Sequence, residues 1–161
     1  MTRKNTEHIV ERAERFATNK HAEIDHKRKY TLDPYIVHPR AVVEILKEVP
    51  HTEEMLAAAW LHDTVEDTNT SLQEIDDEFG SVVSELVEML TDVSKPEDGN
   101  RAARKEKDRL HTEKSSPKAK TIKLADLIDN SKSILKYDKS FAKVYINEKK
   151  ELLKVLKEGD S

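Results

Sequence analysis

Residues 57–68 read Ala-Ala-Ala-Trp-Leu-His-Asp-Thr-Val-Glu-Asp-Thr, an apolar segment that ends abruptly in charged side chains. Its small and apolar residues predict a helix over about 52–63, which a neighbouring helix can approach closely. His62 and Asp63 fall at the end of this helix, and two more carboxylates follow at once. Three carboxylates and an imidazole within six residues cost stability unless a cation compensates. The stretch therefore predicts a metal site, although a charged helix end in solvent is the other interpretation.

Two further segments present residues of the same kind. Residues 35–39 read Tyr-Ile-Val-His-Pro, and because proline is favoured at the first helical position, His38 is expected just before a helix that starts at Pro39. Residues 123–130 read Lys-Leu-Ala-Asp-Leu-Ile-Asp-Asn, which places Asp126 on a largely apolar helix. A buried carboxylate needs a partner, which a lysine, a helix N-terminus or a metal ion can supply. Alone, His38 is more typical of a structural histidine.

Taken together, the three segments offer two imidazoles and two carboxylates. This donor set suits one borderline-hard divalent cation and leaves positions for water and a substrate phosphate. The candidate metal ligands are His38, His62, Asp63 and Asp126.

The rest of the chain also predicts helices joined by short loops. With 161 residues, 3 glycines and 5 prolines, the composition favours one all-α domain over a strand-and-turn architecture. Apolar spacing, proline and glycine positions, and a capping box at Ser71–Glu74 set the expected elements. We expect helices over 5–22, 39–50, 71–80, from 81 onward, over 101–114, from 116 onward and over 140–158, with a loop at 94–100. Trp60 and Tyr35 are expected in the core.

Overall composition excludes several classes of protein. A net charge of -4 and 5% aromatic residues argue against nucleic-acid binding. The chain has no cysteine, no apolar signal region and no run near the ~18 apolar residues that span a bilayer. We therefore expect a cytoplasmic protein without membrane contact. Residues 101–109 carry a local net charge of +3, which indicates either a solvated helix face or a phosphate-reading surface.

In combination, the motifs resemble those of the HD-domain phosphohydrolases, and within them the small alarmone hydrolases and the hydrolase half of RelA/SpoT enzymes. The similarity runs from about His21 to Tyr145, and its best-matching blocks are residues 34–39, 61–68, 115–117 and 123–126. It implies a compact multi-helix HD-domain bundle, a single domain over 1–161, and a manganese-type ion at the four candidate ligands. It also implies removal of the 3′-pyrophosphate from guanosine tetra- or pentaphosphate, which gives pyrophosphate and GDP or GTP.

The resemblance also implies roles for residues around the metal. Glu66 and Asp67 match the acidic pair that positions and activates the attacking water. A second set matches positions that contact the substrate's base, ribose and phosphates. These residues are Arg28, Lys95, Arg101, Arg104, Lys105, Asn130 and Tyr145.

Two departures from the family pattern keep other functions open. The family usually has a basic residue, a leucine and an aromatic residue or histidine after Asp126. Here Leu127, Ile128 and Asp129 stand there and are expected to alter the edge of the pocket. A glycine before the Pro-Tyr pair is also replaced, by Leu32-Asp33. The alternatives are an HD-domain hydrolase for another nucleotide, such as an adenosine analogue or a dinucleotide cofactor phosphate, and a catalytically silent nucleotide-binding module. The sequence leaves the oligomeric state open.

Overall fold

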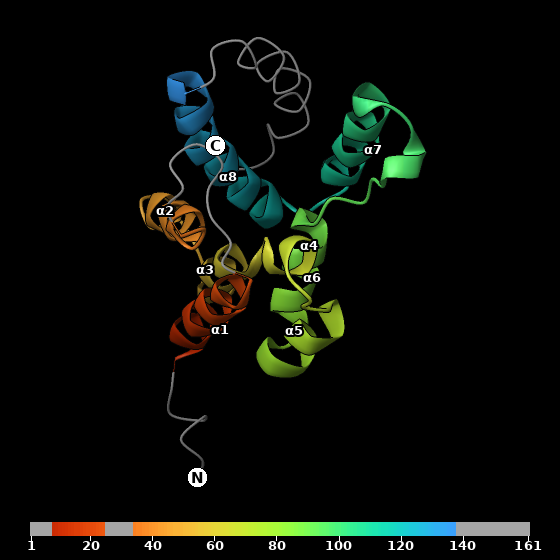
Figure 1. The fold of residues 1–161 in the computed structure, drawn as a ribbon. Helices are drawn as coiled ribbons and strands as arrows, with labels where there is room; N and C mark the ends of the chain where they lie inside the picture. Colours follow the sequence, from red (N-terminus) through yellow and green to blue (C-terminus); the bar gives the residue numbers. More distant parts are fainter. Residues whose placement is uncertain (1–7, 25–33, 138–161) are drawn as a thin grey trace.

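The structure, a computed structural model, describes residues 8–24 and 34–137, with side chains as far as residue 132. The regular elements in these ranges are helices, so the predicted all-α class is confirmed (Figure 1). In chain order they are α1 (Ile9–Glu23), α2 (Val37–Leu46), α3 (Glu53–Leu61), α4 (Thr64–Asp67), α5 (Leu72–Phe79), α6 (Ser81–Leu90), the 3-10 helix η2 (Pro96–Asp98), α7 (Arg101–Glu113) and α8 (Pro117–Tyr137). None of the described helices is long and apolar enough to cross a membrane. The helix expected over 140–158 lies outside the described residues.

Helix α3 forms the centre of the core. Every residue from Met55 to Leu61 is buried, and the helix packs against α1, α2, α6 and α8. Ala57, Ala58 and Ala59 have no exposed surface, which lets the backbones of neighbouring helices come close. The Thr52 hydroxyl caps the helix by accepting a hydrogen bond from the backbone N–H of Met55 at 3.1 Å. Because α3 is fixed on several sides, its C-terminal end is a rigid place for the residues that follow.

Helix α5 begins at the capping residue that the sequence predicts, and the predicted glycine separates it from α6. The Ser71 hydroxyl accepts a hydrogen bond from the backbone N–H of Glu74 at 3.1 Å, which starts α5. Gly80 lies between the two helices at φ 91°, a left-handed conformation that glycine adopts without strain. The predicted boundary between these helices is therefore confirmed.

Three helices have boundaries that differ from the prediction. Helix α1 begins at Ile9 rather than at about residue 5, and α3 ends at Leu61 rather than at about residue 63. Helix α2 begins at Val37, so His38 is its second residue rather than the residue before it. Pro39 fits at the third position because the first N–H groups of a helix have no intrahelical acceptor. Helix α2 ends at Leu46, short of Pro50, and the expected loop at 94–100 contains η2.

Helix α7 stands apart from the other described helices (Figure 1). Thr112 is its one buried residue, as its lack of apolar side chains predicts. The Asp108 carboxylate fastens it to the segment before η2: Oδ1 accepts from the backbone N–H groups of Val93 and Ser94, each at 2.9 Å, and Oδ2 accepts from Ser94 Oγ at 2.7 Å. Polar contacts therefore set the position of α7 more than packing does.

Candidate metal centre

Three helices bring the four predicted metal ligands together. Helix α2 carries His38, the turn between α3 and α4 carries His62 and Asp63, and α8 carries Asp126. One ligand atom from each residue lies within 4.8 Å of all the others. His38, His62 and Asp126 are buried, and Asp63 is partly exposed. Two nitrogen and two oxygen donors at this spacing fit one divalent cation.

Hydrogen bonds hold both imidazole rings. Nδ1 of His62 donates to the backbone carbonyl of Ala59 at 2.6 Å, which leaves Nε2 facing Asp126 Oδ1 at 3.2 Å. Nε2 of His38 lies 2.7 Å from the same Asp126 oxygen, and its Nδ1 lies 2.6 Å from Asp129 Oδ2. Both rings therefore turn Nε2 toward the shared carboxylate at the centre of the group.

The charges of the group are strongly coupled. Burial disfavours the charged imidazole of His38, but hydrogen bonds to Asp126 and Asp129 outweigh it and raise its pKa to about 9. The pKa of His62 is also raised, because Asp63 and Asp126 overcome the effect of burial. Burial opposes ionisation of Asp63 and Asp126, but His62 lowers the pKa of Asp63 to about 2, and Lys123 with both imidazoles holds that of Asp126 well below its usual range. Without a metal ion, protons on the imidazoles neutralise two ionised carboxylates, a role that a divalent cation can take over.

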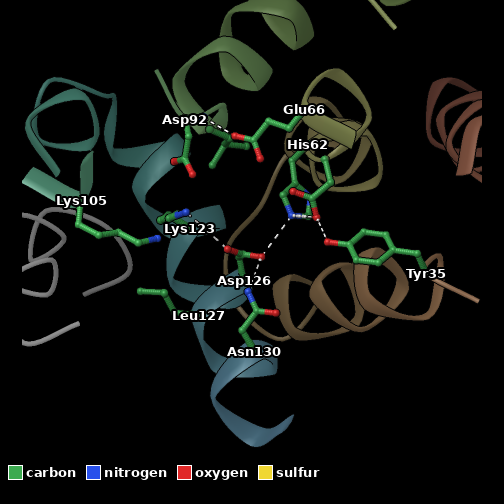
Figure 2. Close-up of a pocket in the computed structure, with 11 residues that line it drawn as sticks. Tyr35, His62, Glu66, Asp92, Lys105, Lys123, Asp126, Leu127 and Asn130 are labelled. Carbon is green, nitrogen blue, oxygen red and sulfur yellow. Dashed lines mark hydrogen bonds and ion pairs between the residues drawn. The ribbon is translucent and has the colours of Figure 1, made fainter. Parts of the chain in front are cut away.

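Three of the four ligand residues, His62, Asp63 and Asp126, form part of the wall of a cavity of about 220 Å³, whereas His38 does not line it. Figure 2 shows Lys105 and Lys123 on one side of it, with His62 and Tyr35 on the opposite side. Its lining residues are Tyr35, His62, Asp63, Glu66, Leu90, Asp92, Lys105, Lys123, Asp126, Leu127 and Asn130. The cavity is therefore mostly polar and is bordered by both signs of charge.

Of the predicted acidic pair, Glu66 lines the cavity and Asp67 does not. A Glu66 carboxylate oxygen accepts a hydrogen bond from the backbone N–H of Asp92 (Figure 2). Although Glu66 reaches solvent, surrounding protein and then the Asp92 carboxylate raise its pKa to about 8. Burial and then the charge of Asp63 raise the pKa of Asp67 to about 6. Glu66 is thus better placed than Asp67 to take a proton from a molecule in the cavity.

The expectation that Tyr35 belongs to the core is wrong, because this residue lies at the site. Its hydroxyl donates a hydrogen bond of 2.5 Å to Asp63 Oδ2 (Figure 2). Burial and then the Asp63 carboxylate raise the pKa of this hydroxyl, so it stays protonated. Its position three residues before His38 is the sequence feature that could have identified it as a site residue. Trp60 is buried, as predicted.

Lys123 is a cavity residue that the sequence reasoning missed. Its Nζ lies 3.6 Å from Asp126 Oδ2, and the side chain is 19% exposed. Burial opposes its charge, but Asp126, Asp92 and Glu66 together raise its pKa. The spacing of three residues between Lys123 and Asp126, which places both on one side of a helix, could have identified it.

The predicted substrate contacts divide into three groups. Lys105 and Asn130 line the cavity, and Asn130 Nδ2 donates to Asp126 Oδ1 at 3.3 Å. Lys95, Arg101 and Arg104 are not among the lining residues. Arg28 and Tyr145 lie outside the described residues and stay predictions.

The three departures after Asp126 have different surroundings. Leu127 lines the cavity, as expected. Ile128 is 46% exposed and does not line the cavity, because its position on α8 turns it to solvent. Asp129 is buried beside His38 rather than at the pocket edge. The expectation that all three alter the pocket edge is therefore wrong for Ile128 and Asp129.

Known proteins are similar to this chain in sequence and in fold. The guanosine-3′,5′-bis(diphosphate) 3′-pyrophosphohydrolase of Aquifex aeolicus is 38% identical over 125 residues, which cover 78% of this chain and 18% of that protein. The human guanosine-3′,5′-bis(diphosphate) 3′-pyrophosphohydrolase MESH1 is 39% identical over 124 residues, which cover 74% of this chain and 65% of that protein. The chain thus spans less than a fifth of the Aquifex protein and just under two thirds of the human one.

A solved structure, described as a metazoan orthologue of SpoT that hydrolyzes ppGpp, matches with a TM-score of 0.84 and 29% identity. The match covers 96% of this chain and 89% of that one. The family model described as HD domain matches residues 13–146, a range that includes all four candidate ligands. The chain therefore belongs to the HD-domain family.

Proposed function

We propose that this protein is a divalent-metal-dependent hydrolase that removes the 3′-pyrophosphate from guanosine 3′,5′-bis(diphosphate). The observation that carries the proposal is the group of four ligand atoms within 4.8 Å, next to a cavity that three of the four ligand residues line together with Glu66 and two lysines. The names of the Aquifex and human relatives support the substrate. We further propose Mn²⁺ as the ion, because mixed imidazole and carboxylate donors suit a borderline-hard metal that also binds phosphate oxygens.

The charges of the cavity explain why a cation is needed. Four carboxylates line it (Asp63, Glu66, Asp92 and Asp126), but only two lysines do so among the described residues. When these carboxylates are ionised and the imidazoles are neutral, the surface repels a polyphosphate. A divalent cation together with Lys105 and Lys123 makes the cavity attractive to a nucleotide that carries two diphosphate groups.

The side chains then divide the work of hydrolysis. When bound, the metal ion acidifies water and polarises phosphoryl oxygens. Glu66 accepts the proton of the attacking water, and its raised pKa of about 8 makes it a competent base near neutral pH. Water attacks the phosphorus bonded to the ribose 3′ oxygen, the bond between these two atoms breaks, and the 3′ oxygen takes up a proton to leave as a hydroxyl. Lys105 and Lys123 offset the negative charge of the diphosphate group during this transfer. Water is the nucleophile in this scheme, so no nucleophilic side chain is required.

Pyrophosphate release from guanosine tetraphosphate tests the proposal directly. The protein is stripped with a chelator, reloaded with Mn²⁺ and compared with Asp63→Ala, which removes one ligand. Asp77→Ala on α5 is the matched control, because it removes an exposed carboxylate that does not line the cavity. We expect activity in the wild type and in the control but not in Asp63→Ala. A folded, metal-loaded wild type that releases no pyrophosphate would end the alarmone assignment.

Leu127 favours a second candidate, the same hydrolysis on a different nucleotide. It places an apolar side chain in the cavity wall at a position where the resemblance implies a basic residue. A panel of guanosine and adenosine nucleotides and dinucleotide cofactor phosphates, each assayed for phosphate and pyrophosphate, separates the two candidates. Stoichiometric metal binding without turnover on any of them would instead support the catalytically silent module.

The proposal also covers cellular context. We place the protein in the cytoplasm, since a chain without cysteine suits a reducing compartment. We treat residues 1–161 as one domain and a small nucleotide as its partner. A net charge of -4 argues against nucleic acid in that role.

A further inference from the structure

The geometry points to Asp129 as a positioning residue that fixes the tautomer of His38 and strengthens it as a metal ligand. This inference rests on the metal site of the proposed function, but it concerns a carboxylate outside the ligand set. Asp129 follows Asp126 by three residues on α8, so one turn of this helix places both carboxylates on the same side. His38 lies between them.

The contact between Asp129 and His38 is short and enclosed. Asp129 Oδ2 lies 2.6 Å from His38 Nδ1, and the two residues are 8% and 1% exposed. An ionised carboxylate can only accept a hydrogen bond, so Nδ1 carries the proton. The lone pair of the neutral ring is then on Nε2, the atom that faces Asp126 Oδ1 at 2.7 Å and Asp63 Oδ2 at 3.8 Å. Asp129 thus directs the ligating nitrogen toward the ligand group.

His62 and His38 differ in the group that accepts the hydrogen bond from Nδ1. Nδ1 of His62 donates to the carbonyl of Ala59, a neutral backbone acceptor that no substitution can remove. His38 donates instead to a negatively charged side chain. A carboxylate behind an imidazole makes the ring a stronger electron donor to a metal at its far nitrogen. The two histidines therefore present the same atom to the metal, but His38 is the stronger donor and depends on one replaceable side chain.

Metal affinity of the isolated protein tests this role without any substrate. Chelator-stripped wild type, Asp129→Asn and Asp129→Ala are titrated with Mn²⁺, and free Mn²⁺ is measured by electron paramagnetic resonance. Asparagine keeps an acceptor oxygen but removes the charge, whereas alanine removes both. We expect affinity to fall about 10–100-fold in Asp129→Asn and at least as much in Asp129→Ala.

Two control variants separate this contact from less specific effects. Ile128→Ala changes the neighbouring, exposed residue of α8 and should leave Mn²⁺ affinity unchanged. Asp67→Asn removes a carboxylate that acts on both imidazoles through its charge, and should weaken Mn²⁺ less than Asp129→Asn does. Wild-type affinity in Asp129→Asn would overturn the inference, as would an equal loss in Asp67→Asn.

Nuclear magnetic resonance of the wild type covers the case in which the Asp129 variants do not fold. In protein labelled with ¹⁵N and loaded with diamagnetic Zn²⁺, the ring proton of His38 should be found on Nδ1. A proton on Nε2 would overturn the inference. Neither measurement uses a nucleotide, so a failure of guanosine tetraphosphate hydrolysis would refute the proposed substrate while these results decide the role of Asp129.

Discussion

Glu66 combines the position and the proton affinity expected of a general base. It lines the cavity beside the ligand group, and its pKa of about 8 reflects the surrounding protein and the nearby Asp92. We predict that Glu66→Gln, which preserves shape but cannot take up the proton, lowers kcat about 10²–10⁴-fold and leaves KM nearly unchanged. Steady-state kinetics at saturating Mn²⁺ measures both constants. A kcat within a few-fold of the wild type would transfer the role to another group, with Asp67→Asn the next variant to assay.

The imidazoles make metal binding a proton-release reaction. Below their raised pKa values His38 and His62 hold protons that a metal ion must displace, whereas Asp63 and Asp126 are already ionised near neutral pH. We predict that Mn²⁺ binding at pH 7 releases about two protons and that affinity rises with pH up to about 9. Titration calorimetry in two buffers with different ionisation enthalpies gives the number of protons. Identical apparent enthalpies in both buffers would contradict the assignment of His38 and His62 as ligands.

The helices show which parts of the structure the sequence alone could predict. Residues 55–61 are apolar on every side, which correctly predicts the buried centre of the fold, and Ser71 and Gly80 mark real helix ends. The grouping of the four candidate ligands could be predicted because each lies in a short motif within a helix or at its end. Tyr35 and Lys123 were not predicted as site residues because their roles depend on contacts with Asp63 and Asp126. Residue type and spacing made those contacts possible but did not show that they form.

The basic segment at 101–109 illustrates the same limit. Its charge alone allowed either a phosphate surface or a solvated face. In the structure Lys105 reaches the cavity, whereas Lys107 pairs with Asp98 and Arg109 with Glu106 on the outside of α7. The orientation of α7 decides which of these cations faces the cavity and which faces solvent, and polar contacts determine that orientation.

Asp108 is therefore the residue through which to test the placement of α7. Asp108→Ala removes three hydrogen bonds that join this helix to Val93 and Ser94, next to the cavity residue Asp92. Since hydrogen bonds to a charged group contribute roughly 1.5–3 kcal/mol, we predict a looser α7, a KM raised several-fold and little change in Mn²⁺ affinity. Kinetics and hydrogen exchange of α7 amides measure these effects. Unchanged KM together with faster exchange would show that Lys105 contributes nothing to substrate binding.

Across the whole molecule, metal binding should stabilise the fold, because the ligands come from α2, α3 and α8 and meet only in the native state. At a metal concentration 100-fold above Kd the gain is about 2.7 kcal/mol, or roughly 5–10 °C in Tm for a chain of this size. Thermal unfolding with Mn²⁺ and with chelator measures this difference. Asp63→Ala should lose most of it, and an equal metal effect in that variant would place the ion elsewhere.

The same measurement has a defined pH dependence. The pKa of His38 is about 9 in the folded, metal-free protein and near 6.5 when unfolded, so its stabilising contribution is complete below pH 6.5 and lost as the pH rises through 9. The raised pKa of Glu66 acts in the same direction. We predict that metal-free Tm falls between pH 6.5 and 9 and that the gap to the metal-loaded protein widens. A gap that narrows over this range would contradict the protonation states assigned here.

The loose attachment of α7 bears on how the proposed enzyme can change over evolution. The ligands and Glu66 belong to the packed centre and its immediate ends, whereas Lys105 belongs to a helix with one buried residue. Most substitutions on such an exposed helix alter stability by no more than about 0.5 kcal/mol, so the cations of α7 can vary while the hydrolytic centre persists. In the proposed enzyme, the substrate contacts that come from this peripheral helix can therefore change by single substitutions while the metal centre keeps its structure.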